Sequence, residues 1–102
     1  MEPVDLLVTP TGPTAATLLE GDLTTSDEAD PQVLAALIHF CGPFNLTGLP
    51  AVSIPCGFTP GGLPVGMQLV GKPWQEGSIL AAAHAYQQAT DWHHRLPALL
   101  AP

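Results

Sequence analysis

A long stretch of this chain is almost free of charged side chains. From Pro31 to Gln75, Lys72 is the only formally charged residue. A compact domain of this mass leaves about 36% of its unfolded surface in contact with water, so an isolated domain could not hide the whole stretch from solvent. We therefore expect residues 1–102 to form one partial domain whose apolar surface is covered by further protein.

Charge and hydropathy also exclude several classes of partner. Two basic residues stand against nine acidic ones, giving a net charge of −7. Binding to a nucleic-acid backbone needs basic side chains that displace the counterions of the phosphates, and binding to anionic lipid also needs basic side chains. This chain has too few of them for either. No apolar run reaches the roughly 20 residues of a membrane-spanning helix, and the acidic start lacks the features of a secretory signal. We expect a cytoplasmic protein with neither a nucleic-acid nor a membrane partner.

The first third of the chain predicts one strand and one long loop. Residues 4–9 are apolar, rich in β-branched side chains and followed by Pro10, which is typical of a buried strand. Residues 10–30 hold several prolines and glycines together with five of the nine acidic residues and no basic one. This composition predicts a solvated acidic loop, and a loop of such length is unusual in a complete domain.

The remaining residues predict a helix, a hairpin and a second helix. Asp30 and Pro31 form a helix start, and Gly42 with Pro43 favours its end near Cys41, with apolar side chains on every face. Residues 51–55 and 65–71 are expected to pair across a type II turn at residues 59–62. Residues 77–90 form an amphipathic helix with Ile79, Ala82, Ala83, Tyr86 and Ala89 on its packed face. The fold class is α/β, in the order strand, helix, strand, strand, helix.

No residue of the chain has the neighbours that catalysis requires. Ser26 lies in the acidic loop, Ser53 in a strand expected to be buried, and Ser78 at a helix start, where capping is its expected role. The four histidines lack the spacing of a zinc site, and no phosphate or dinucleotide loop occurs. Lys72 ends a strand, where lysines are solvated. We expect no catalytic residue, metal or cofactor, and we expect Cys41 and Cys56 to be free, buried apolar side chains.

Two neighbouring stretches carry a specific pattern, PFNLTGLPAVSIPCG at residues 43–57 and GLPVGMQLVG at residues 62–71. They resemble the C-terminal part of the amidase signature family. Residues 5–11 and 86–97 are similar to the strand and the final helix that flank this region in the family. The resemblance implies a mixed sheet flanked by helices, and it leaves open both the amide cleaved and the choice between a general amidase and an amidotransferase subunit.

The resemblance implies hydrolysis of linear carboxamides to carboxylate and ammonia by a nucleophilic serine, a bridging serine and a lysine base. That set lies upstream of the matched segment, and Lys72 does not match its lysine, so we expect this chain alone to be inactive. The family resemblance makes His39, Phe40 and Phe44 the candidates for the substrate pocket.

Four further residues of the resembling stretch have a structural role by their own chemistry. Asn45 and Thr47 are short polar side chains of an expected turn, Gly48 permits a positive φ, and Pro50 fixes the entry to the next strand.

Three interpretations follow from the sequence. The favoured one is a C-terminal amidase fragment that needs an upstream amidase segment to cover its apolar surface. The alternative is a non-catalytic interaction module that dimerises or docks on another protein through its hairpin and first helix. The third is an independent hydrolase that uses Ser53 or Cys56 as the nucleophile.

Overall fold

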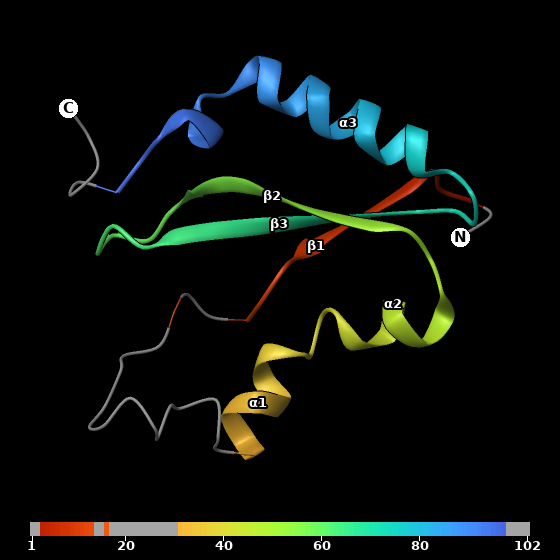
Figure 1. Ribbon diagram of the computed structural model, residues 1–102, viewed down its shortest axis with the longest axis horizontal. Coiled ribbons are helices and arrows are strands. Elements are labelled where there is room, and N and C mark those ends of the chain that lie inside the picture. Colours follow the sequence, from red (N-terminus) through yellow and green to blue (C-terminus); the bar gives the residue numbers. More distant parts are fainter. Residues whose placement is uncertain (1–2, 14–15, 17–30, 98–102) are drawn as a thin grey trace.

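The computed structural model describes residues 3–13, 16 and 31–97. Within them the chain forms three strands, three α-helices and one 3-10 turn (Figure 1). In chain order these elements are β1 (Leu6–Pro10), α1 (Pro31–Leu37), α2 (Gly42–Thr47), β2 (Ala51–Phe58), β3 (Pro64–Gly71), α3 (Glu76–Ala89) and η2 (Trp92–His94). The predicted α/β class and element order are confirmed, with α2 and η2 added. Most of the predicted acidic loop, residues 14–15 and 17–30, lies outside the described residues.

The three strands form one antiparallel sheet in the order β1-β3-β2. The predicted hairpin of β2 and β3 is confirmed, and its strands continue further toward the turn than expected. In the pairing register Val52 faces Leu69 and Ile54 faces Met67, while Ser53 faces Gln68. Because successive side chains of a strand point to opposite faces, the first two pairs lie on one face and the Ser53–Gln68 pair on the other.

The connection between β2 and β3 differs from the predicted type II turn. The amide of Gly62 donates to the carbonyl oxygen of Thr59 at 2.9 Å, and the amide of Thr59 donates to the carbonyl oxygen of Leu63 at 2.8 Å. A type II turn needs a positive φ at Gly61, but the positive φ of 89° occurs at Gly62. The connection is therefore a three-residue loop whose last residue is left-handed, which suits the twist of a hairpin.

Helix α3 covers the apolar face of the sheet and makes the core (Figure 1). Ile79 and Ala83 are buried against Ile54 and Leu69, with Tyr86 packed at the margin. The predicted packed face is correct except for Ala89, which is exposed because the helix ends there. Ser78 does not cap the helix backbone, since its hydroxyl donates to the side chain of Gln75 at 3.0 Å.

The predicted helix over residues 31–41 is shorter than expected. Helix α1 ends at Leu37, a turn follows, and Gly42 with Pro43 begins α2 instead of only ending α1. Proline is tolerated in the first turn of a helix because the amide hydrogen it lacks has no partner there, so the same pair of residues can stop one helix and start another. Leu34 and Ile38 are exposed, so the described residues of this chain do not cover this segment all round.

Gly71 is expected to resist substitution, whereas Gly77 is not. A Cβ atom at Gly71 would lie 2.7 Å from Cγ2 of Ile79, while one at Gly77 would meet nothing within 4 Å. Gly71→Ala should lower the free energy of unfolding by about 1–3 kcal/mol through overpacking. Gly77→Ala should raise it by about 0.5 kcal/mol, because alanine is the better helix former. Urea denaturation of the two variants checks the sign of each change.

Candidate functional site

The described residues form two hollows beside the sheet, which share the wall made by Thr11 and Cys41. The larger, of about 740 Å³, is bounded mainly by apolar side chains such as Pro10, Phe40 and Val65. The smaller, of about 420 Å³, includes several polar side chains. Both reach residues of the segment between α1 and α2, which lies on the other side of the sheet from α3 (Figure 1).

Hydrogen bonds hold the α1–α2 connection against the sheet. The side-chain amide of Gln68, on the central strand β3, donates to Oγ1 of Thr9 and to the carbonyl oxygen of Phe40, each at 3.0 Å. The thiol of Cys41 donates to the carbonyl oxygen of Thr11 at 3.3 Å. Gln68 thus joins the edge strand β1, the central strand and the α1–α2 connection, and it positions Phe40 and Cys41 at the hollows.

The three predicted pocket residues are placed differently. Phe40 lines the larger hollow and Phe44 the smaller one. His39 lines neither; it is exposed, and its ring packs edge-on against Phe40 with 4.8 Å between centroids. The structure therefore brings Phe40 and Phe44 toward one face of the sheet and leaves His39 at the surface.

The four residues assigned a structural role surround α2, which replaces the predicted turn. Asn45 lies on this helix and lines the smaller hollow. The Thr47 hydroxyl donates to the carbonyl oxygen of Phe44 at 3.5 Å. Gly48 ends the helix with the expected positive φ, 74°, and the carbonyl oxygen of Pro50 accepts from the amide of Gly71 at 2.9 Å. Asn45 thus has access to a site as well as a place in the scaffold.

Ser53 and Lys72, which the sequence offered as a possible nucleophile and base, do not contact each other but bind other side chains. Ser53 is exposed rather than buried as expected, and its Oγ lies 2.6 Å from Oγ1 of Thr11. Lys72 forms an ion pair with Asp5 at 3.4 Å. Ser26 lies outside the described residues.

The two cysteines are free, as predicted, but each is half-buried rather than buried. In the part of the chain that the structure describes, no three His, Cys, Asp or Glu side chains gather closely enough to hold a metal ion.

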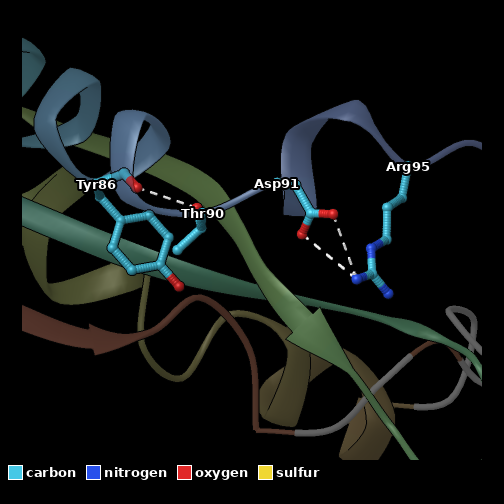
Figure 2. Close-up of polar contacts among 4 residues, drawn as sticks. All are labelled: Tyr86, Thr90, Asp91 and Arg95. Atoms are coloured by element: carbon cyan, nitrogen blue, oxygen red, sulfur yellow. Dashed lines mark hydrogen bonds and ion pairs between the residues drawn. The ribbon is translucent and has the colours of Figure 1, made fainter.

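A cluster at the end of the chain escaped the sequence analysis. Figure 2 shows Arg95 reaching back to Asp91, with its Nη2 atom 3.4 Å from Oδ1, beside Thr90, whose hydroxyl donates to the carbonyl oxygen of Tyr86 at 3.0 Å. The guanidinium of Arg95 also lies 4.6 Å from the ring centroid of Trp92. The i, i+4 spacing of opposite charges was the available signal. Turn η2 lies beside β2, where the ring centroid of Trp92 is 6.0 Å from that of Phe58.

Comparison with known proteins decides the family. The sequence pattern of the Amidase family matches residues 1–80. The chain belongs to the amidase signature family. The matched region includes β1, both hollows and the hairpin, so the site described above is built from the part of the chain that carries the family pattern.

Individual relatives agree with this assignment. A glutamyl-tRNA(Gln) amidotransferase subunit of Microcystis aeruginosa is 49% identical over 92% of the chain, and its counterpart in Moorella thermoacetica is 46% identical over 96%. A solved 6-aminohexanoate cyclic dimer hydrolase matches 95% of the chain with a TM-score of 0.77 and 31% identity. The solved glutamyl-tRNA(Gln) amidotransferase subunit from Thermotoga maritima matches 88% of it with a TM-score of 0.74 and 32% identity.

The chain spans only a small part of the length of these relatives. It covers 18% and 19% of the two curated relatives, and 22% and 18% of the two solved chains. None of the helices among the described residues has the length and apolar character needed to cross a membrane.

Proposed function

We propose that this chain is the C-terminal segment of an enzyme that hydrolyses linear carboxamides, and that it supplies scaffold and pocket wall rather than reacting groups. The observation that carries the proposal is the match over nearly the whole chain to relatives of which it covers about a fifth. The Ser-Ser-Lys set implied by the family resemblance then belongs to an upstream amidase segment. The names of two relatives, a hydrolase and an amidotransferase, support amide chemistry.

The partners of the polar side chains support a non-catalytic role. Amide hydrolysis needs a nucleophile within hydrogen-bond reach of a base, together with donors for the developing oxyanion. The hydroxyl of Ser53 is paired with Thr11, and that of Ser78 donates to Gln75. Neither partner is a base. In the described part of the chain, neither serine therefore has a residue that would activate it.

Exposed apolar side chains support a covering segment. Leu46 on α2 is 90% exposed, and Leu34 and Ile38 in and beside α1 are also exposed. They lie around the α1–α2 connection, on the side of the sheet that α3 leaves open (Figure 1). Exposed apolar surface of this kind marks an interaction site. We assign it to the upstream amidase segment, and Phe40 and Phe44 to the wall between that segment and the hollows.

Reconstitution tests the proposal. The chain should release no ammonia from a simple carboxamide by itself, and neither should the preceding part of the Microcystis aeruginosa relative. The two combined should do so. Ammonia release by the chain alone, abolished by Ser53→Ala, would overturn the proposal in favour of an independent hydrolase. A defined homo-oligomer in light scattering, with no gain of activity on mixing, would favour the interaction module.

A further inference from the structure

The turn between β3 and α3 presents a tryptophan to solvent in a strained backbone conformation. Trp74 is 90% exposed, and its φ of 64° is left-handed. The amide of Gln75 donates to the carbonyl oxygen of Lys72 at 3.0 Å, which closes a four-residue turn. Pro73 is its second residue and Trp74 its third, the arrangement of a type II turn. The third position of such a turn favours glycine, because a side chain is crowded at positive φ.

Both ends of this turn are anchored in the fold. Gly71 precedes it and pairs with Leu6 in the sheet. After it, the carbonyl oxygen of Gln75 accepts from the amides of Ser78 and Ile79 at 3.1 and 3.4 Å, in the first turn of α3. A single exposed apolar side chain is ordinary. Here, however, the anchored turn also maintains backbone strain to present the indole, and strain of this kind is typical of functional sites.

The charges around Trp74 favour a protein as its partner. Glu76 lies two residues further on and is exposed, and Lys72 is already paired with Asp5 at 3.4 Å. The whole chain carries a net charge of −7. Stacking on a nucleic-acid base or insertion into an anionic membrane would bring like charges together. An apolar pocket on a protein surface can take up an indole without that cost, and tryptophan is enriched at the centres of protein interfaces.

The place of the turn in the fold indicates which protein this is. Because Leu6 pairs with Gly71 and Asp5 with Lys72, the residues just before β1 lie beside the β3–α3 turn (Figure 1). Protein joined ahead of β1 therefore meets this end of the sheet first, where Val4 is also 40% exposed. Since the chain covers only 18% and 19% of two curated relatives, the remainder is long enough to reach this end as well as the α1–α2 connection.

We propose that Trp74 and the β3–α3 turn form a docking surface for the upstream amidase segment, which receives the indole in an apolar pocket. The inference rests on the proposed function. It deepens that function by adding a contact at the end of the sheet, apart from the exposed side chains around the α1–α2 connection. The anchored turn holds the indole in one place before the two segments meet, which reduces the entropy lost on docking.

Fluorine NMR measures whether the indole becomes covered. The chain is labelled with 5-fluorotryptophan, both alone and joined through residue 1 to the preceding part of the Microcystis aeruginosa relative. The Trp74 signal is identified by its loss in Trp74→Phe. In the isolated chain this signal should shift when H₂O is replaced by D₂O, as that of an exposed indole does, and in the fusion this solvent shift should be lost. Persistence of the solvent shift in the fusion would rule out the docking surface. Its loss in the isolated chain, together with a dimer in light scattering, would assign the surface to a second copy instead.

The affinity between the two separate pieces supplies a second measurement. Trp74→Gly should weaken their association by at least about tenfold, as removal of a central tryptophan does. It should not lower the urea midpoint of the isolated chain, because glycine adopts a positive φ without strain. Leu63→Ala is the matched control, since it removes an exposed apolar side chain at the opposite end of β3, and it should leave the affinity unchanged.

The outcomes separate this inference from the proposed function. Equal affinities of the Trp74→Gly and Leu63→Ala variants would contradict the docking surface. Ammonia release by a fusion in which Trp74 stays exposed would overturn the docking surface alone. A covered Trp74 in a fusion that releases no ammonia would overturn the proposed function and leave the docking surface standing.

Discussion

Replacing Leu69 by aspartate is expected to unfold the isolated chain. Leu69 is 4% exposed at the centre of the cluster formed with Ile54, Ile79 and Ala83. An aspartate there would lose the apolar contacts and place a carboxylate among hydrocarbon side chains with no partner. The expected cost is about 4 kcal/mol or more. Since even a complete domain of this size is stable by only about 5–15 kcal/mol, circular dichroism and urea denaturation should show a largely unfolded or strongly destabilised protein.

Val8→Asp is the matched control for this substitution. Val8 is the cross-strand partner of Leu69 on β1, but its side chain is 61% exposed. The two variants therefore place the same charge on neighbouring strands and differ chiefly in burial. Val8→Asp should change the free energy of unfolding by about 0.5 kcal/mol or less, as surface substitutions usually do. Equal destabilisation by both variants would contradict the placement of Leu69 inside the core and of Val8 at its exposed edge.

Period-two and amphipathic patterns predicted the hairpin and α3 because local sequence determines both. Alternating side chains and the glycine-rich segment at residues 59–62 specify two paired strands, and small residues around Ile79 specify a packed helix face. The boundaries of the first helix were harder to predict, because Gly42 and Pro43 can end one helix and also begin the next. Gly61 and Gly62 posed a similar ambiguity, because either glycine can adopt a positive φ.

The candidate site was less predictable because it depends on the register between distant strands. Phe40 and Phe44 were singled out through the family resemblance, but Gln68 was not. The sequence signal was a polar residue between Met67 and Leu69 in an otherwise apolar strand. The role of Gln68 follows only from its pairing with Thr9 on one neighbouring strand and with Ser53 on the other. Such pairing comes from tertiary structure, and burial of a polar group demands the partners that the structure supplies.

Truncation of Ile79 should reveal how strongly α3 is held to the sheet. Ile79 is 3% exposed and packs at the core, and its Cγ2 atom lies beside Gly71. Ile79→Ala removes those contacts and leaves a cavity that a small core cannot fill, so the free energy of unfolding should fall by about 2–5 kcal/mol. The measurement is again urea denaturation followed by circular dichroism.

Leu80→Ala supplies the comparison for Ile79→Ala, because it changes the next residue of the same helix. Leu80 is 58% exposed, so its truncation loses little buried area, and alanine favours the helix slightly more than leucine. The stability of this variant should stay within about 0.5 kcal/mol of the unmodified chain. Similar losses in both variants would mean that a different face of α3 packs on the sheet.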